Sequence, residues 1–460
     1  MKECPSVSDL RVAPGSLDCE IVAKSDVVVV GGGPAGVSAA VTAARSGASV
    51  TLLERYPALG GLASGGMVLV LDDMINGQEI TVSGIVAEYV ERMTAMELAV
   101  VPPEEDRYAS TEMWNKWGRY GVFDFHQSQN PKPICYSVAF DPDAWKRVSN
   151  DLVREAGVNL RLHSWFSRPI VEDGTMRGVI AETKEGPQAI LGDVVIDTTG
   201  DIDVASRAGA SYVKDSYLTT LVFRLGGVDT AQAERFEQAD PKAARLINKK
   251  IKRVLGGAWE LWWLKTPVPG VVWCNAPHMT GYDGTDPVSM TAAEFAARDR
   301  IAEAVALCRE TLPGFENAYI VDVAEQMGVR QTRLLQGEYV VTAEDVHSRR
   351  HFADSVARGR DYYTPYRALL PKEVDQLLVA GRHYSATPQA QKMSREIPPC
   401  MAMGQAAGVA AALAANGGCT VREVPAPEIQ AVMRKFGADP GDQPSANAMD
   451  VTASNEGTAV

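Results

Sequence analysis

The sequence predicts an α/β protein built around a parallel sheet, and three features near its N-terminus support this fold class. Residues 27–30 are four consecutive valines, an unbroken β-branched run that is typical of a strand buried on both faces. Gly31, Gly33 and Gly36 follow at once with the spacing G-x-G-x-x-G, and Glu54 ends a second apolar run. Together these features predict a strand, turn, helix and second strand that bind a dinucleotide.

Each position in this unit meets a physical demand. Gly31 permits a tight turn, Gly33 lets the backbone approach a pyrophosphate, and Gly36 allows the next helix to pack on the strand. The helix expected over residues 35–46 directs its N-terminal amides at that pyrophosphate. The carboxylate of Glu54 can accept hydrogen bonds from an adenosine ribose. A glycine-rich turn that serves packing alone is the alternative.

The composition is that of an ordinary globular protein. The 460 residues suit two interleaved domains, or one large domain with insertions. Fifty-eight acidic and 45 basic residues leave a net charge of −13, which disfavours nonspecific binding to nucleic acid or anionic membranes. Seven cysteines without C-x-x-C or metal-ligand spacing suggest reduced thiols and no metal site. We find no secretory signal and no apolar run of membrane-spanning length, so we expect a cytoplasmic protein without membrane insertion.

A second glycine loop and a long irregular segment follow Glu54. Residues 60–66 contain four glycines, a density that lets backbone approach a flat ligand closely; a flexible surface turn is the alternative. An amphipathic helix is expected over residues 80–96. The aromatic-rich residues 101–133 either wall a substrate pocket or pack on the surface as a lid.

Regular patterns return at Asp141, which is expected to cap a helix that runs to about Ala156. Short strands between residues 160 and 191, with Asp-Gly and Glu-Gly turns, predict a β-meander. Residues 193–197 then read as another buried strand, which ends in Thr198-Thr199-Gly200-Asp201.

The middle of the chain reads as a separate α+β segment. A strand is expected at residues 222–228 and a clear helix at 291–311. The tryptophans of this segment and His278 are expected to be structural. Arg330 and Arg333 can grip carboxylates of the protein or of a substrate, and a structural ion pair is expected for Arg333.

This order of motifs resembles the FAD-dependent oxidoreductases of the glutathione-reductase-like fold. It is similar, within them, to the branch shared with fumarate reductase and succinate dehydrogenase flavoprotein subunits. Two later stretches match as well: a strand that ends in Gly381 and Arg382, and a small-residue helix that opens near residue 394 and ends at Gly417. The matches span residues 26–418.

The resemblance implies a Rossmann-like FAD-binding domain with a β-meander, plus an inserted α+β substrate domain. The FAD-binding domain is expected at residues 25–220 and 341–420, with a possible lid at 75–140, and the substrate or cap domain at 221–340. An N-terminal arm at 1–24 and a disordered tail at 437–460 complete the prediction.

The resemblance also implies the cofactor contacts. In that family the helix N-terminus lies under the flavin pyrimidine, where Gly404, Gln405 and Ala406 can offer amides. The residues expected to bind FAD are Gly31, Gly33, Pro34, Ala35, Gly36, Glu54, Arg55, Gly61, Leu62, Ala63, Ser64, Phe166, Thr199, Gly200, Asp201, Gly381, Arg382, Gly404, Gln405 and Ala406. No histidine near residues 61–67 corresponds to the one that carries covalent flavin in succinate dehydrogenase. We therefore expect noncovalent FAD, and this departure weakens the case for succinate or fumarate as substrate.

Flavin exchanges hydride at N5, while the protein orients the substrate and manages a proton. Arg395 is the expected active-site cation, because the matching family arginine lies near the flavin. His383 can act as acid or base at neutral pH. Tyr366 and Arg367 are further catalytic candidates. For each of them, hydrogen bonding to the cofactor or closing a turn is the alternative.

We therefore predict an FAD-dependent oxidoreductase that desaturates, or in reverse reduces, a small organic substrate next to a carbonyl or carboxylate. An alcohol or amine oxidase and a flavin-carrying electron-transfer subunit of a larger complex remain alternatives. The lack of a second G-x-G-x-x-G after a strand and of C-x-x-C argues against a pyridine-nucleotide disulfide reductase. The expected partners are a small-molecule substrate and an unidentified electron donor or acceptor, without nucleic acid, and a homo-oligomer is compatible with the sequence.

Overall fold

The computed structural model describes residues 19–76, 79–108, 110–121, 138–257, 260–360 and 362–443, and every structural statement below concerns these residues. Most of the predicted N-terminal arm, residues 122–133 of the aromatic segment and residues 444–460 of the predicted tail lie outside the described residues. The first residues of that tail are described, and there Asp439 pairs with Arg358 and Pro440 O accepts a hydrogen bond from Ser355.

A seven-stranded sheet forms the base of the fold and confirms the predicted α/β class. Its order is β8-β2-β1-β11-β10-β9, and β23 pairs with β11 beside this path. Pairing is parallel among β8, β2, β1, β11 and β23, and antiparallel in the meander of β11, β10 and β9. The strands are β1 (Glu20–Val30), β2 (Val50–Leu53), β8 (Asn159–Arg161), β9 (Trp165–Glu172), β10 (Thr175–Thr183), β11 (Gly186–Asp197) and β23 (Leu377–Val379).

The valine run lies in the middle of this sheet. Val27, Val28 and Val29 are fully buried, because β1 has a strand on each side and helices above. The Asp173-Gly174 turn has positive φ at both residues, as the turn prediction requires.

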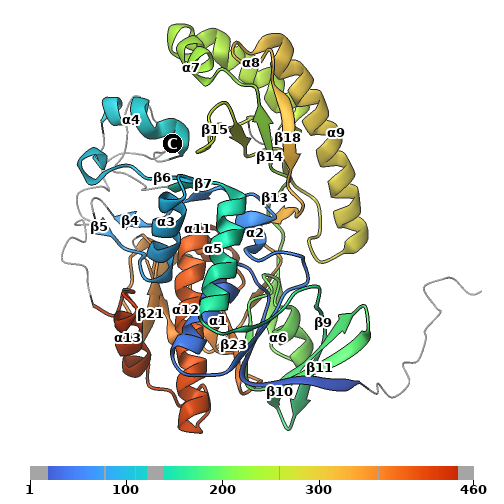
Figure 1. The fold of residues 1–460 in the computed structure, drawn as a ribbon, viewed down its shortest axis with the longest axis vertical. Helices are drawn as coiled ribbons and strands as arrows, with labels where there is room; N and C mark the ends of the chain where they lie inside the picture. The colour runs from blue at the N-terminus through green and yellow to red at the C-terminus, as the bar shows by residue number, and fades with distance from the viewer. Residues whose placement is uncertain are drawn as a thin grey trace, which may run out of the picture.

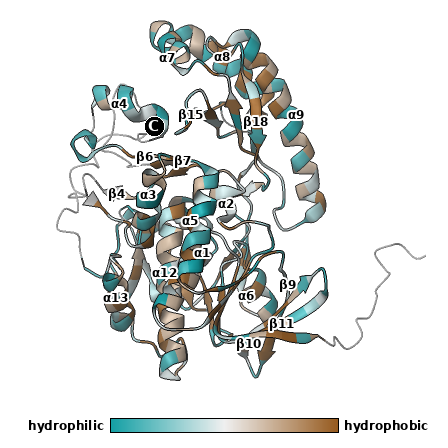
Figure 2. Ribbon diagram, in the orientation of Figure 1, coloured by the Kyte–Doolittle hydropathy of each residue, from teal (hydrophilic) through white to brown (hydrophobic). Residues whose placement is uncertain are grey.

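Two helices pack closely over β1. α1 (Pro34–Arg45) packs directly against α12 (Ile397–Gly417). The helices are so close that a Cβ added to Gly404 or Gly408 would lie 2.1 or 2.2 Å from a main-chain oxygen of α1. α12 is long and apolar enough to cross a membrane, but 94% of its apolar window is buried inside the protein. Its small-residue pattern is explained by helix packing, and Figure 2 shows it among other apolar segments.

The segment between β2 and β8 contributes to this core. α3 (Ile85–Ala95) buries Ile85, Val86, Tyr89 and Met93, and α5 (Pro142–Glu155) begins at the predicted cap, Asp141. A small sheet joins β3 (Val70–Leu71), β7 (Val138–Phe140) and β6 (Ala99–Val100). α3 is therefore a core helix, whereas α4 (Thr111–Trp117) buries only Met113.

The middle segment lies at the opposite end of the molecule from the meander (Figure 1). A four-stranded antiparallel sheet has the order β15-β16-β14-β18. The elements of the middle segment are β14 (Phe223–Gly226), α7 (Thr230–Ala239), α8 (Pro241–Val254), β15 (Trp263–Lys265), β16 (Val272–Cys274), α9 (Pro287–Thr311) and β18 (Tyr319–Val323). α9 begins four residues before the predicted helix, since Asp286 caps it and Pro287 fits its first turn.

Two short sheets connect the middle segment (residues 223–323, called the cap segment below) to the seven-stranded sheet at the base. One joins β17 (His278–Met279), β13 (Thr219–Thr220) and β19 (Gly328–Val329), and the other joins β12 (Tyr212–Lys214) to β20 (Arg333–Leu335). The predicted ion pair of Arg333 is confirmed, with Asp203 at 2.8 Å. The remaining elements are β4 (Ile75–Asn76), β5 (Glu79–Ile80), α6 (Asp203–Ala208), α10 (Ala343–His347), β21 (Ser355–Arg358), β22 (Tyr363–Pro365), α11 (Pro388–Ser394) and α13 (Ala426–Lys435).

Candidate functional site

The turn after β1 has the geometry that its motif predicts. The amide of Gly32 donates to Glu54 Oε2 at 2.6 Å, and the amide of Tyr56 donates to Oε1 at 2.9 Å. Burial raises the pKa of Glu54 above its ordinary value, although both amides oppose that change. Glu54 therefore closes the turn, and each of its oxygens keeps a lone pair for a ribose hydroxyl.

Gly31, Gly33 and Gly36 form one side of the candidate cofactor-binding region, which is called the cradle below. A Cβ on Gly36 would lie 1.7 Å from Gly31 O, so α1 can pack on β1 only with glycine at that position. A Cβ on Gly33 would meet nothing nearer than Gly61 Cα, at 4.0 Å. The two glycine loops pack on each other, since a Cβ on Gly61 would lie only 2.9 Å from Gly33 Cα. No side chain therefore covers the main chain at the start of α1, where Pro34 and Ala35 lie and where a pyrophosphate is expected.

The second glycine loop forms the short helix α2 (Gly61–Ser64). Leu62 is partly exposed, whereas Ala63 and Ser64 are buried, and Ser64 Oγ donates to Leu59 O at 2.7 Å. Ala63 and Ser64 can therefore offer a cofactor their main chain only.

The end of β11 forms another wall. Thr198 Oγ1 donates to the main-chain oxygens of Val30 and Gly31, which joins β11 to the first turn. Gly200 has φ +90°, and a Cβ there would lie 2.6 Å from the guanidinium of Arg382. Thr199 and Gly200 thus leave room where a side chain would obstruct the cradle.

Asp201 and Arg382 meet at this wall. Arg382 Nη2 lies 3.0 Å from Asp201 Oδ1, which also accepts a 2.6 Å hydrogen bond from Thr332. Burial alone would raise the pKa of Asp201, but the charge of Arg382 and the bond from Thr332 hold it below its ordinary value. Within the described residues the buried Nε of Arg382 has no hydrogen-bond partner, which leaves a donor for a bound ligand.

Arg55 and Phe166 lie near the adenosine end expected of this cradle. The guanidinium of Arg55 lies 4.9 Å from the ring centres of both Tyr56 and Trp165. Phe166 is buried beneath the guanidinium of Arg207, at 5.7 Å. These aromatic and cationic groups can flank a nucleotide base.

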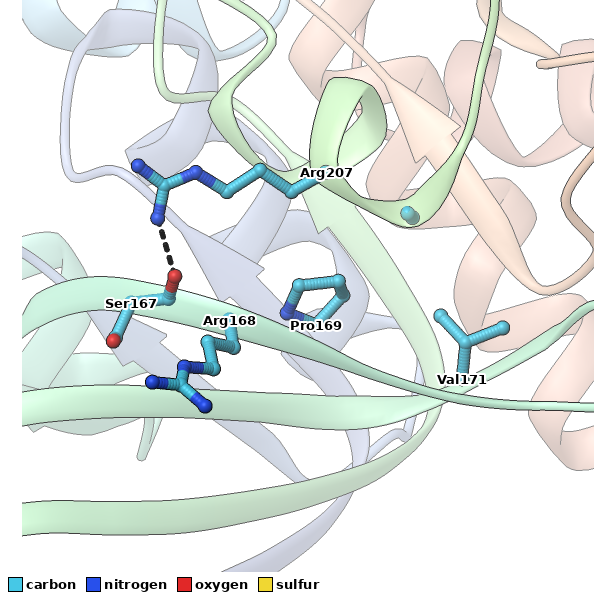
Figure 3. Close-up of a pocket in the computed structure, with 6 residues that line it drawn as sticks. Ser167, Arg168, Pro169, Val171 and Arg207 are labelled. Atoms are coloured by element: carbon cyan, nitrogen blue, oxygen red, sulfur yellow. Dashed lines mark hydrogen bonds between the residues drawn. The ribbon is translucent and has the colours of Figure 1, made fainter. Parts of the chain in front are cut away.

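A cavity of about 660 Å³ lies beside Phe166, between β9 and α6 (Figure 3). Arg207 crosses it and donates to Ser167 O. The lining residues are Ser167, Arg168, Pro169, Val171, Arg207 and Ala208. None of them is a predicted catalytic residue, and Arg207 is exposed, so we assign this cavity no chemistry.

His383 does not occupy the position that acid–base catalysis requires. It is 1% exposed, and its Nε2 lies 3.2 Å from Asp197 O and 3.4 Å from Asp197 Oδ1. Burial alone would raise the pKa of Asp197, but hydrogen bonds from His383, Ala205 and Thr199 keep it below its ordinary value. The structure therefore makes His383 a buried partner of β11, beneath Gly381.

Tyr366 and Arg367 are likewise engaged elsewhere. Tyr366 is buried, and its hydroxyl donates to Val421 O at 2.7 Å. Arg367 donates to both carboxylate oxygens of Asp354, at 2.8 and 3.1 Å. The catalytic role expected for these two residues is not supported, because their polar groups hold the C-terminal loops together.

The start of α12 also differs from the prediction. The helix begins at Ile397, so Gly404, Gln405 and Ala406 lie in its third turn, where amides bond within the helix. The expectation that these three offer free amides is wrong. Gly404 packs on α1, and Gln405 Oε1 accepts from Ile85 N at 3.3 Å. The free helix terminus lies at residues 397–399, and two of these are prolines.

Arg395 lies just before this terminus, within a cluster of charged and polar side chains. Arg395 Nη2 lies 3.4 Å from Glu396 Oε1. Arg330, which follows β19, places Nη2 2.6 Å from His278 Nε2 in β17. Asp72, which follows β3, acts electrostatically on Arg330 and is acted on by Arg395 and Glu396. Arg330 and His278 are therefore in contact, and the charged groups of Asp72, Arg395 and Glu396 influence this part of the structure electrostatically.

The cluster changes the ionisation of its members. Burial, then the charges of Arg330 and Arg395, lower the pKa of His278 to about 3. Burial, then the charge of Arg395, lower the pKa of Arg330 to about 10. Burial, then the charges of Glu396 and Asp73, raise the pKa of Asp72 well above its ordinary value. At neutral pH the imidazole is therefore neutral, whereas the guanidinium group of Arg330 remains charged.

The sequence pointed to only part of this cluster. Arg395 was predicted as the site cation, and Arg330 as a candidate carboxylate ligand. Asp72 was not singled out because it belongs to no motif. His278 was expected to be structural, and Glu396 lies within the matched C-terminal stretch but was given no role. In the described part of the chain, no three His, Cys, Asp or Glu residues are arranged to hold a metal.

Comparison with known proteins supports the cofactor assignment. The family model of FAD dependent oxidoreductases matches residues 26–363 and 358–433. Fumarate reductase (cytochrome) from Shewanella frigidimarina is 51% identical over 59 residues, 12% of this chain and 10% of that protein. NADH:acrylate oxidoreductase from Vibrio harveyi is 58% identical over 45 residues, 9% of this chain and 4% of that protein. The matched stretches thus span a tenth or less of these relatives.

Solved structures match this chain at low sequence identity. p-Nitrophenol 4-monooxygenase from Pseudomonas putida has a TM-score of 0.47 at 12% identity, and the match covers 92% of this chain and 88% of that chain. A geranylgeranyl bacteriochlorophyll reductase-like protein from Thermoplasma acidophilum has a TM-score of 0.45 at 14% identity, over 90% of this chain and 82% of that chain. The family match covers most of the sequence, and the chain accordingly belongs to the FAD dependent oxidoreductases and is an enzyme that uses FAD.

Proposed function

We propose that this flavoenzyme adds hydrogen to, or removes it from, a small organic substrate at the carbons next to a carbonyl or carboxylate. The observation that carries this proposal is the guanidinium group of Arg330, which lies 2.6 Å from a neutral His278, together with Arg395 just before α12, whose charge acts on both of these groups.

The residues present fit noncovalent FAD. The main chain at Gly33 and Gly200, which no side chain covers, and the unpartnered Nε of Arg382 suit a pyrophosphate and its neighbouring groups. Glu54 has lone pairs available for the ribose. When bound, FAD would supply the exchange of a hydride with the substrate.

The chain's own side chains would bind and orient the substrate. Arg330 and Arg395 can each donate two parallel hydrogen bonds to a carboxylate, and Arg can polarise a carbonyl in the same way. His278 is neutral, so its Nε2 can accept from Arg330 and hold that guanidinium in place. The partly buried site strengthens these interactions relative to those in water.

The short matches support the choice of substrate class. The names of both relatives state an unsaturated carboxylate, fumarate in one and acrylate in the other. An α,β-unsaturated acid or ketone would present the same negative or polarised oxygen to Arg330 and Arg395. The two short matches support the proposal that this chain is related to the fumarate reductase branch, and the proposal does not name fumarate as its substrate.

The test is an anaerobic absorbance titration of the purified enzyme. Wild type would be reduced with dithionite and mixed with enones and unsaturated carboxylic acids; oxidised enzyme would be mixed with NADH, NADPH, saturated acids, alcohols and amines. We expect unsaturated acids or enones to restore the oxidised flavin bands. Bleaching by alcohols or amines alone would indicate an oxidase, and a flavin unresponsive to every compound would indicate an electron-transfer subunit.

A further inference from the structure

A cavity of about 220 Å³ lies in the cap segment, between α8 and the chain that leads into β15. Four of its lining residues have the spacing i, i+3, i+4, i+7 and therefore share one face of α8: Pro241, Ala244, Arg245 and Asn248. Glu260, Trp262 and Trp263 line it as well. Pockets that hold a whole small molecule usually measure roughly 300–1,000 Å³, so this cavity suits one part of a substrate.

Part of the lining is fixed by groups that already bind each other. Arg119, which follows α4, forms an ion pair with Glu237 of α7. The indole of Trp263 donates to Glu237 Oε1 at 3.2 Å, and the Arg119 guanidinium lies 4.1 Å from the centre of the Trp263 ring. The charges of Arg119 and Glu237 offset each other, so this part of the lining attracts neither anions nor cations strongly.

Three polar side chains of the lining are available to a ligand. Among the residues that the structure describes, no hydrogen bond or ion pair engages Arg245, Asn248 or Glu260. The guanidinium offers donors, the carboxylate offers acceptors, and the amide offers both. A group bound here can therefore both accept and donate hydrogen bonds.

The lining disfavours a charged group. An anion beside Arg245 would also face the carboxylates of Glu237 and Glu260, and a cation would face two guanidinium groups. Hydroxyl groups suit the cavity, because each can accept from a guanidinium or an amide while it donates to a carboxylate. The indole of Trp262 adds a flat apolar surface on which the C–H face of a ring can pack.

Trp262 connects this cavity to the proposed substrate cation. Its ring stacks on the imidazole of His278, with the ring centres 6.5 Å apart and 28° between the planes. His278 Nε2 in turn lies 2.6 Å from Arg330 Nη2. Trp262 has φ 49°, a left-handed conformation that is rare for bulky residues, and Trp262 O accepts from Asn275 N at 3.2 Å. The fold thus holds a strained tryptophan in contact with both the cavity and the partner of Arg330.

We propose that this cavity is the subsite for the remote end of the substrate, and that it takes a neutral group with several hydroxyls, such as a sugar ring, packed on Trp262. The inference rests on the proposed function, because it names the part of that substrate that does not react. The carbonyl or carboxylate end binds Arg330, and the hydroxyls bond with Arg245, Asn248 and Glu260. The substrate is then a hydroxylated unsaturated acid or enone.

The first experiment measures binding without turnover, by saturation-transfer NMR on the oxidised enzyme loaded with FAD. The probes are methyl glucoside and methyl glucuronide, which differ by one carboxylate. We expect stronger transfer to the neutral glucoside. Glu260→Gln removes one of the repelling carboxylates, so it should narrow the difference between the two probes.

Variants then place the binding in this cavity. Asn248→Leu should weaken methyl glucoside binding roughly 3- to 10-fold, the effect of one neutral hydrogen bond. Lys249→Gln is the matched control, since Lys249 is an exposed neighbour on α8 that does not line the cavity. Trp262→Leu should abolish the transfer, and Trp262→Phe, which keeps a flat ring, should recover part of it.

A second experiment links the cavity to the reaction. KM is measured for an unsaturated acid that carries a sugar or polyol group and for crotonate, which lacks one. The hydroxylated acid should have the lower KM in wild type and in Lys249→Gln. Asn248→Leu should reduce that preference roughly 3- to 10-fold. Methyl glucoside should compete with the hydroxylated acid.

The proposal fails if wild type shows no transfer to methyl glucoside, or prefers the glucuronide. Equal transfer in wild type, Asn248→Leu and Trp262→Leu would place the binding elsewhere and overturn it too, as would equal KM values for the two acids. A wild type whose reduced flavin no unsaturated acid or enone reoxidises would instead overturn the proposed function, while the NMR result would still decide which group the cavity binds.

Discussion

The side-chain amide of Gln391 donates a 2.9 Å hydrogen bond to the main-chain oxygen of Arg330. The same nitrogen donates to Arg382 O at 3.0 Å, and the side-chain oxygen accepts from Gln331 at 2.9 Å. Gln391 is fully buried in α11. One side chain therefore joins the segment after β19, which carries the proposed substrate cation, to the turn that carries the proposed cofactor contact.

Replacing Gln391 by Leu should weaken substrate binding as well as stability. Two buried carbonyl groups would lose a donor, at about 1–3 kcal/mol each, and Arg330 would lose its fixed position. The matched control is Gln430→Leu, because the buried Gln430 also bridges two carbonyls, those of Ala353 and Ser355, at 2.9 Å each. Both variants should lower the Tm, but only Gln391→Leu should raise KM. An equal KM in the two variants would contradict the proposal that Gln391 positions Arg330.

Substrate binding should depend on the paired donors of the Arg330 guanidinium group and not only on its positive charge. Arg330→Lys keeps the charge but loses paired donors, so KM for an unsaturated acid should rise roughly 10- to 100-fold. Arg333→Lys is the control, since Arg333 pairs with Asp203. Arg330→Met should in addition raise the pKa of His278 from about 3, because one of the charges that lower it is gone. A histidine proton titration by NMR would check this shift, and an unchanged pKa would contradict the electrostatic coupling.

The sequence was sufficient to predict the base of the fold, because its signals are local. The valine run, the spaced glycines, Glu54 and the Asp-Gly turn each act within a few residues, and each lies where the pattern indicated. The wrong predictions share a different cause. Motif position could not show that α12 begins at Ile397, or that His383 turns toward Asp197.

The candidate site could be predicted only in part for the same reason. Asp72, His278 and Arg330 are separated by dozens to hundreds of residues, and each lies in or next to a two-residue strand. No period or spacing in the chain marks such strands. The noncovalent state of FAD, the cytoplasmic location and the electron donor or acceptor remain predictions.

The two motif glycines should respond differently to alanine. Gly36→Ala places a Cβ 1.7 Å from Gly31 O, so the helix must move and the protein should lose stability with or without FAD. Gly33 has φ −72°, and its nearest neighbour to a Cβ is 4.0 Å away, so Gly33→Ala should fold normally. Its methyl group would project into the proposed pyrophosphate space and weaken FAD binding. Thermal melts of apoprotein and a fluorescence titration with FAD separate these effects; full FAD affinity in Gly33→Ala would show that the cofactor does not pass this turn.

Asp197 should stabilise the fold in a pH-dependent way. Its carboxylate accepts hydrogen bonds from Thr199, Val204 and Ala205 and lies beside His383, and its pKa is lowered from the ordinary value of 3.8. A depressed folded pKa gives stability that is fully present above the unfolded value and is lost as pH falls through the folded value. Asp197→Asn should therefore cost about 1–3 kcal/mol at pH 7, since buried amides lose their acceptor. The difference from wild type should shrink below pH 3.8. Urea unfolding at pH 7 and at pH 3 measures both values, and a constant difference would show that the carboxylate charge contributes nothing.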